Sequence, residues 1–104
     1  MKLVLICAGG LSTSWIVRKM KDYAREHNLD LDVQACGLAD YEDPASGADL
    51  VLLGPQIGYY QKEISQRLNR PITVIDSADY ALANIETILK KAAETLVIQN
   101  SMRF

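Results

Sequence analysis

The chain has 104 residues, of which 49% are hydrophobic and 23% are charged, and its formal net charge is −2. This length suits a single domain over residues 1–104, and the slightly acidic charge argues against nucleic-acid binding or a polybasic contact with a membrane. No apolar run approaches the roughly 20 residues of a membrane span, and one histidine with two isolated cysteines makes no zinc-ligand pattern. We therefore expect a cytoplasmic protein with reduced thiols and without a metal or cofactor.

Four short apolar runs alternate along the chain with polar or amphipathic stretches. Each run is rich in Val, Ile and Leu, which is typical of strands that are buried on both faces of a sheet. The runs cover residues 3–7, 31–36, 50–54 and 72–76. Because candidate helices separate them, the order βαβαβαβα predicts an α/β fold with a parallel sheet.

The stretches between the runs predict the helices. Residues 12–27 form the first helix, whose inward face carries Ile16, Met20, Tyr23, Ala24 and His27. Residues 40–46 can hold a short helix that a proline limits. Residues 59–68 form the third helix, which turns Tyr60, Ile64 and Leu68 inward.

The last predicted helix covers residues 79–96, and a frayed tail follows over residues 97–104. Its apolar stripe predicts one continuous buried face. The residues of this stripe are Ala81, Leu82, Ile85, Ile88, Leu89, Ala92, Ala93 and Leu96. Lys90 and Lys91 are among the charged residues expected on the opposite side.

The loop after the first run carries the most chemical information. Its residues are Cys7, Ala8, Gly9, Gly10, Leu11, Ser12, Thr13 and Ser14. The glycines permit backbone conformations that turn several N–H groups toward one point, and the start of the next helix adds unpaired N–H groups and a partial positive charge. The three hydroxyls either cap the helix or donate to anionic oxygens. These groups predict that residues 8–14 bind an anion of phosphate size.

Cys7 is expected at the mouth of this anion-binding loop. Amide groups that hold a phosphate also favour a thiolate over a thiol, so the sequence predicts a nucleophilic cysteine. The alternative is a small core residue at the end of a strand, because buried free cysteines are common.

The loop has no arginine. Low-molecular-weight tyrosine phosphatases use a cysteine, five residues and then an arginine in a similar loop, whereas Thr13 occupies the arginine position here. Without a guanidinium the loop stabilises transition-state charge less strongly, which favours a carrier that keeps its phosphoryl group. Asp43 precedes a proline, a pair typical of a turn rather than of a catalytic acid. A small phosphatase or arsenate reductase is the alternative function, and a regulatory anion sensor is a third.

With these residues in view, three motifs in order resemble the enzyme IIB component of the lactose/cellobiose-type sugar phosphotransferase system, over about residues 2–96. The first is the cysteine loop, in which family members often carry Ala in place of Gly9 and Met in place of Leu11. The second is Leu-Leu-Gly-Pro-Gln-Ile at residues 52–57. The third is Val-Ile-Asp-Ser at residues 74–77, followed by Tyr80.

The resemblance implies a four-stranded parallel sheet in the order 2-1-3-4 with helices on both faces, similar to low-molecular-weight tyrosine phosphatase. It also implies a phosphate relay. A phosphohistidine on a IIA partner donates to Cys7, which passes the group to a sugar bound by the membrane component IIC. The sugars of the family are mostly β-linked disaccharides such as cellobiose, chitobiose or lactose.

The implied strand order places a ligand-binding switch point between the first and third strands, where we expect Cys7 to meet residues 54–56. Gln56 either lies beside the phosphate or only shapes the rim of the site. Asp76 ends the fourth strand at the same edge, and a helix cap is its favoured role. Tyr80, the third rim candidate, lines a partner surface or belongs to the core.

Four further residues have open roles. Trp15 points away from the apolar face of its helix, so it is a candidate IIA contact or packs on a neighbouring loop. Tyr59 is a second candidate contact, or is core. Cys36 ends the second strand and either reaches Cys7 in a protective disulfide or is inert core. His27 is interpreted as a cation at a helix C-terminus rather than as a phosphohistidine.

Overall fold

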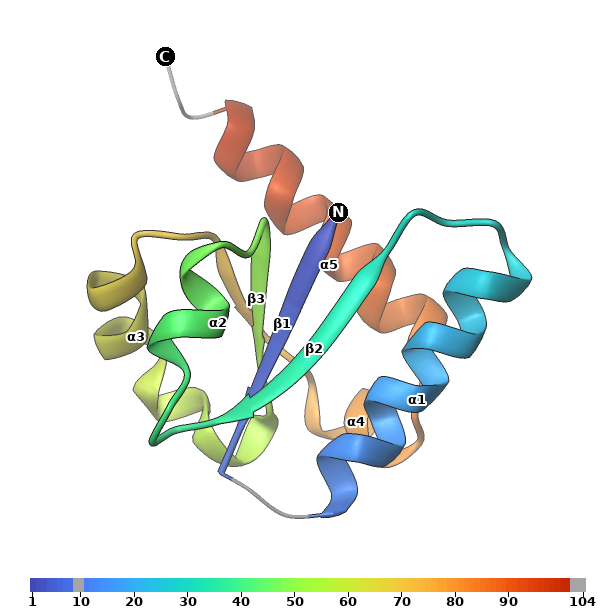
Figure 1. Ribbon diagram of the computed structural model, residues 1–104, viewed down its shortest axis with the longest axis horizontal. Coiled ribbons are helices and arrows are strands. Elements are labelled where there is room, and N and C mark those ends of the chain that lie inside the picture. Colours follow the sequence, from blue (N-terminus) through green and yellow to red (C-terminus); the bar gives the residue numbers. More distant parts are fainter. Residues whose placement is uncertain (9–10, 102–104) are drawn as a thin grey trace.

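The computed structural model describes residues 1–8 and 11–101, with the side chains of 11–13 and 97–101 left out. Strands and helices alternate along the chain, as the apolar runs predicted (Figure 1). The elements are β1 Lys2–Cys7, α1 Leu11–Glu26, β2 Asp32–Gly37, α2 Glu42–Ser46, β3 Leu50–Leu53, the 3-10 helix η1 Pro55–Tyr60, α3 Gln61–Leu68, β4 Ile72–Val74, α4 Ser77–Ala81 and α5 Ile85–Ser101.

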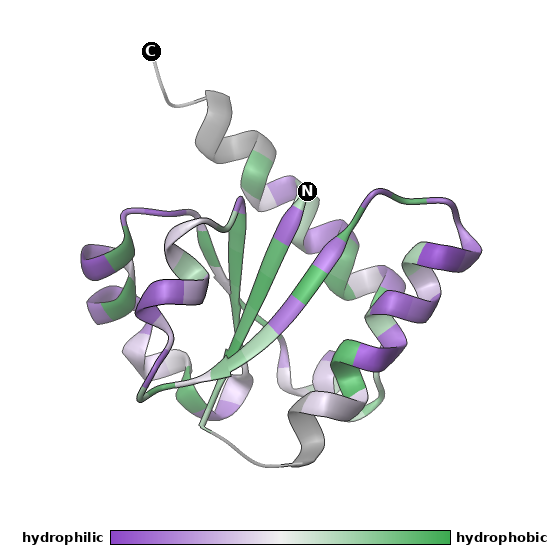
Figure 2. Ribbon diagram, viewed as in Figure 1, coloured by the Kyte–Doolittle hydropathy of each residue, from purple (hydrophilic) through white to green (hydrophobic). Residues whose placement is uncertain are grey.

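The four strands form one parallel sheet in the order β2-β1-β3-β4, which confirms the expected topology. Helices α1 and α5 lie on one side of the sheet and α2 and α3 on the other (Figure 1). Strands β1 and β3 are mostly apolar, whereas β2 and the helices carry hydrophilic stretches (Figure 2). This pattern follows from the double-sided burial that a parallel sheet requires.

Successive residues of β1 face opposite sides of the sheet because side chains alternate along a strand. Leu3, Leu5 and Cys7 pack into the core cluster beneath α1, α4 and α5. Val4 and Ile6 pack into the cluster on the other side, beneath α2, η1 and α3. The alternation places the Cys7 side chain on the α1, α4 and α5 side.

Helix α1 agrees with the prediction within one residue at each end. Ile16, Met20 and Ala24 are buried as expected. His27 is not, because the helix has ended before it; its ring is exposed and stacks on Tyr23 with 4.0 Å between the ring centroids. The expectation of an inward His27 was therefore wrong.

The predicted helix over residues 59–68 is α3 preceded by a 3-10 helix. Pro55 opens this 3-10 helix, and the backbone kinks at Ile57, where φ is −120°. Ile64 is buried and Leu68 half-buried, in agreement with the prediction. The short helix near residues 40–46 also exists; Pro44 lies in its first turn, where its missing N–H costs no helical hydrogen bond.

The predicted helix over residues 79–96 is two helices, α4 and α5. Ala83 adopts a left-handed backbone conformation with φ of 51° and turns the chain between them. The apolar stripe is consequently broken: Ala81 and Ala93 are exposed and Leu82 is 71% exposed, so their expected burial was wrong. Beyond residue 97, where we expected fraying, α5 continues to Ser101.

Within the described part of the chain, none of the helices has the length and apolar character to cross a bilayer.

Candidate functional site

Cys7 ends β1 at the carboxyl edge of the sheet. β1 lies between β2 and β3, so this edge holds the topological switch point where open α/β sheets bind ligands. The side chain is only 4% exposed, whereas we expected it at an open mouth. Its sulfur lies 3.9 Å from the hydroxyl of Tyr80, and either atom can be the donor. The cysteine thus has a polar neighbour within an otherwise apolar cluster.

Gly54 brings the third strand against this sulfur. A Cβ atom at Gly54 would stand 3.0 Å from Cys7 Sγ and also 3.0 Å from Gln56 Oε1. The sulfur and the amide oxygen therefore lie no farther apart than twice that distance. This places residues 54 and 56 beside Cys7, as expected, and Gln56 remains exposed at the rim. Only a glycine allows this approach without displacing one of the two side chains.

Much of the predicted anion-binding loop lies outside the described residues. This applies to Gly9 and Gly10 and to the side chains of Leu11, Ser12 and Thr13. Ala8 is exposed, and Ser14 is exposed in the first turns of α1. Helix α1 begins at Leu11, close in sequence to the end of β1, at the same edge of the sheet (Figure 1).

The other two rim candidates, Asp76 and Tyr80, have different roles: Asp76 caps a helix and Tyr80 belongs to the core. Asp76 caps α4, since its Oδ1 accepts a hydrogen bond of 2.9 Å from the amide of Ala78, and the favoured role is confirmed. Tyr80 is buried and belongs to the core, with its hydroxyl beside Cys7.

The two candidate partner contacts are both exposed. Trp15 is 46% exposed, and Lys19 Nζ lies 5.2 Å from the centroid of its ring. Tyr59 is 78% exposed and its ring lies 4.5 Å from that of Tyr60, centroid to centroid. Tyr59 was expected to be either a partner contact or a core residue, and its exposure excludes a place in the core.

Cys36 does not face Cys7. It pairs with Ile6 in the ladder between β1 and β2, and it packs against the cluster on the α2 and α3 side, so the two thiols point to opposite faces of the sheet. Burial, followed by the nearby Asp40 carboxylate and the Cys7 sulfur, raises the pKa of Cys36 to about 11. The alternative of a Cys7–Cys36 disulfide has no support from this geometry, and the inert role fits.

A charged cluster beside Tyr80 was not predicted from the sequence. Asp79 is 8% exposed as a residue, and its carboxylate accepts hydrogen bonds from Lys91 Nζ at 3.0 Å and from Asn84 Nδ2 at 3.2 Å. These bonds hold the pKa of Asp79 below its usual range, against the opposite effect of burial, and the bond to Asp79 raises the pKa of Lys91. The helical pattern gave no signal of this cluster, because Asp79 and Lys91 both fall outside its apolar stripe.

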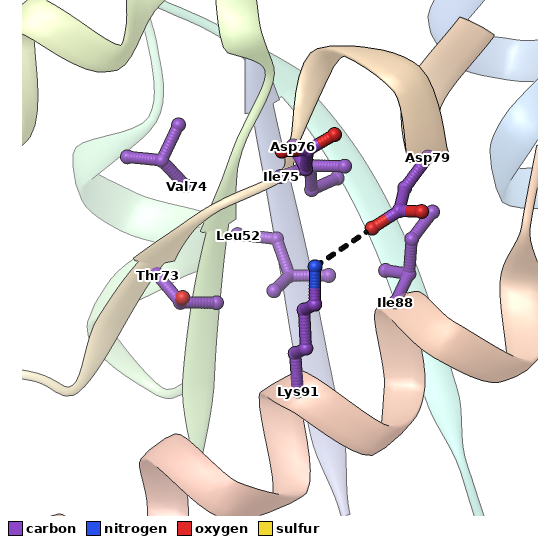
Figure 3. A pocket seen from close by; sticks show the side chains of 8 residues that line it. All are labelled: Leu52, Thr73, Val74, Ile75, Asp76, Asp79, Ile88 and Lys91. Atoms are coloured by element: carbon purple, nitrogen blue, oxygen red, sulfur yellow. Dashed lines mark hydrogen bonds and ion pairs between the residues drawn. The ribbon is translucent and has the colours of Figure 1, made fainter.

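The same aspartate borders a small pocket between β4, α4 and α5 (Figure 3). Its free volume is about 10 Å³, which is room for about one water molecule. Lys91 reaches across this pocket from α5 to Asp79 (Figure 3). Among the described residues, no group of three or more His, Cys, Asp or Glu side chains is arranged to hold a metal ion.

Comparison with known sequences identifies the family. The pattern of the family described as "PTS system, Lactose/Cellobiose specific IIB subunit" matches residues 2–91. The chain belongs to this family. The resemblance seen in its motifs is thereby confirmed, and with it the class of activity, which for IIB subunits is phosphotransfer.

Relatives of this IIB subunit agree with the assignment. It is 32% identical to the oligo-beta-mannoside-specific EIIB component of Bacillus subtilis (strain 168), over 94% of this chain and 98% of the relative. The solution structure of a cellobiose-specific IIB component from Borrelia burgdorferi superimposes with a TM-score of 0.75 at 28% identity, covering 92% of this chain and 91% of the other. Two IIB proteins with different sugar names are thus similar over nearly their full lengths.

The fold is also that of a phosphatase. A low molecular weight protein tyrosine phosphatase from Bacillus subtilis superimposes with a TM-score of 0.59 at 15% identity, over 96% of this chain and 99% of the phosphatase. At this identity the likeness concerns the architecture alone, and it confirms the expected fold class of the IIB subunit.

Proposed function

We propose that this IIB subunit is a phosphocarrier that accepts a phosphoryl group on Cys7 from a phosphohistidine of a IIA partner and passes it to a sugar bound by a membrane IIC component. The observation that carries the proposal is the position of Cys7 at the switch point of the sheet, in contact with Tyr80 and Gly54. Reduced thiols persist in the cytoplasm, so the transfer belongs there.

The first step is an in-line displacement at phosphorus. The Cys7 thiolate forms the S–P bond while the P–N bond to the donor histidine breaks, and the released ring nitrogen keeps the electron pair and takes a proton. In the second step a sugar hydroxyl forms a P–O bond and loses its proton to solvent, while the S–P bond breaks and returns the thiolate. Positioning and electrostatic stabilisation supply the catalysis, and no metal takes part.

The groups that hold the phosphoryl oxygens are the backbone amides of residues 8–14, at the start of α1. Unpaired N–H groups and the helix dipole favour an anion at such a position. Ser12, Thr13 and Ser14 add hydroxyl donors. In this proposal the donor phosphorus approaches Cys7 from the side of this loop.

The sugar is a β-linked disaccharide or oligomer, such as cellobiose, chitobiose or lactose. Support comes from the relatives named for oligo-β-mannosides and for cellobiose. The exposed Trp15 and Tyr59 are the proposed contacts for the IIA partner, since large exposed aromatic side chains are frequent anchors of interfaces.

The decisive experiment is phosphorylation by a IIA protein that carries phosphohistidine, followed by mass spectrometry of the intact chain and its peptides. We expect one phosphoryl group, on the peptide with Cys7. Cys7→Ser abolishes this acid-labile thiophosphate, whereas the matched variant Cys36→Ser retains it. A label on His27, or no label on an intact wild-type chain, contradicts the proposal. Rapid hydrolysis of an aryl phosphate by the chain alone favours a phosphatase instead.

A further inference from the structure

The Asp79 carboxylate joins three segments of the chain. It lies in α4, accepts from Lys91 of α5, and accepts from Asn84 in the turn between these helices. The backbone repeats the connection, since the amide of Asn84 donates to the carbonyl oxygen of Asp79 at 2.9 Å. The cluster of Asp79, Asn84 and Lys91, here called the brace, therefore fixes α4 to α5.

The brace acts on a segment that needs support. Helix α4 has 5 residues, far fewer than the 12 or so at which an isolated helix becomes even marginally stable in water. Asp76 caps its start and the brace holds its end. Tyr80 follows Asp79 directly, so any displacement of α4 moves the Tyr80 hydroxyl relative to Cys7 Sγ, which lies 3.9 Å away.

We infer that Tyr80 donates a hydrogen bond to the Cys7 thiolate, and that Asp79 and Lys91 are positioning residues that hold the hydroxyl at the sulfur. The inference rests on the proposed role of Cys7 as the phosphoryl acceptor. A thiolate has no proton to donate, so in that state the hydroxyl is the donor of this pair. No proton leaves Tyr80 at any step.

The hydrogen bond acts at both ends of the transfer. Before transfer it favours the anionic sulfur that attacks phosphorus, and after transfer it favours the same anion as the leaving group. Hydrogen bonds to charged groups are stronger than those between neutral groups. Among the described titratable groups, Tyr80 faces the sulfur from α4, while Cys36 of β2 lies on the other side of the sheet.

The first test measures the rate of Cys7 alkylation by iodoacetamide against pH, with the Cys7 peptide quantified separately from the Cys36 peptide. Tyr80→Phe removes only the hydroxyl, and we expect the half-maximal pH to rise by about 0.5 to 1 unit, a roughly threefold to tenfold loss of rate at low pH. Tyr41→Phe is the matched control, because Tyr41 is also buried but lies in the opposite core cluster. An unchanged profile in Tyr80→Phe overturns the inference.

The second test separates positioning from direct electrostatics. A negative charge near Cys7 disfavours its thiolate, so removing that charge by itself lowers the half-maximal pH of Cys7 alkylation. Removing a nearby positive charge raises this half-maximal pH. Positioning predicts instead that Asp79→Asn and Lys91→Met both raise it. Lys91→Arg restores the charge-assisted bond and recovers most of the wild-type profile, and Lys90→Met on the exposed side of α5 leaves the profile unchanged. Shifts of opposite sign for Asp79→Asn and Lys91→Met overturn the inference.

The third test is a double-mutant cycle. If Lys91 acts through the hydroxyl, Lys91→Met shifts the profile of the wild type but adds nothing in a Tyr80→Phe background. Additive shifts overturn the inference, and thermal unfolding of each variant ensures that alkylation is measured on folded protein. Transfer of phosphate from the IIA donor is measured separately. If wild-type Cys7 is not labelled, the proposed function is wrong. If Cys7 is labelled but the variants leave the pH profile of its alkylation unchanged, only the inferred role of the brace is wrong.

Discussion

At the scale of single residues, the site depends on how closely atoms approach one sulfur. Gly54 has ordinary extended backbone angles, with φ of −61° and ψ of 149°, so its role is not conformational. What matters is the missing side chain, because Cys7 Sγ and Gln56 Oε1 both occupy the space around it. The glycine in the Leu-Leu-Gly-Pro-Gln-Ile motif is thus explained by its packing against the Cys7 sulfur.

Gly54→Ala is expected to slow phosphorylation of Cys7 about tenfold or more, because the new methyl group displaces the sulfur or the glutamine. The stability cost of the added methyl is about 1 kcal/mol, as for a modest overpacking of a core. Rates from a IIA donor and urea unfolding measure the two effects. Gly47→Ala is the control, since its nearest neighbour is the flexible end of Lys2 at 3.8 Å. Equal rates in wild type and Gly54→Ala would refute the steric role.

Cys36 is expected to react slowly with iodoacetamide at neutral pH. Its pKa of about 11 exceeds the usual value near 8.5, so the folded protein keeps the thiol protonated until pH rises toward 11. The unfolded chain loses this proton at lower pH, so the favourable burial of the neutral thiol is lost progressively above about pH 8.5. Peptide mass spectrometry in buffer and in denaturant measures the difference; equal rates at pH 9 would contradict it.

At the scale of elements, sequence patterns located the strands well and the helix breaks poorly. The central strands β1 and β3 are apolar on both faces, and this pattern can be recognised from the strand sequence alone. The break between α4 and α5 has no glycine or proline to mark it. The break depends on the left-handed backbone conformation of Ala83 and on the hydrogen bonds that Asn84 donates to Asp79. Hydrophobic periodicity reveals neither of these features.

Ala83→Gly is expected to stabilise the protein by about 0.5 to 1 kcal/mol, because glycine adopts a positive φ without the steric penalty of a Cβ atom. Urea unfolding with an unchanged slope measures the gain as a higher midpoint. Ala93→Gly, at an exposed position inside α5, is the control and is expected to cost about 1 kcal/mol. Destabilisation by both substitutions would show that the turn gains nothing from glycine.

At the scale of the whole molecule, the sheet separates two cores that share β1 and β3. The strand order and the meeting of Cys7 with residues 54–56 follow from the motifs together with the rule for switch points in α/β sheets. The brace around Asp79 could not be foreseen, because Lys91 lies on the polar side of α5 and reaches the aspartate only in the folded chain. Surface charge alone does not reveal such a partner.

Leu5→Ala is expected to cost about 2 to 5 kcal/mol, since Leu5 is fully buried in the central strand and the cavity cannot collapse between two flanking strands. Against a typical total stability of about 5 to 15 kcal/mol, this is a large fraction. Leu82→Ala removes the same atoms from an exposed turn and should change the unfolding free energy by less than about 0.5 kcal/mol. Thermal and urea unfolding distinguish the two; similar losses would argue against a core centred on β1.

The direction of β1 has a practical consequence for labelling experiments. The strand starts beside Met1, whose amino group donates to the carbonyl oxygen of Asp30, and runs toward the edge that holds Cys7. Helix α5 runs the opposite way, so its C-terminal end and Met1 both lie on the side of the molecule away from the edge that holds Cys7 (Figure 1). A fluorescent protein or affinity tag fused before Met1 would leave the approach to the sulfur open, so a tagged chain can be used to test the proposed partners.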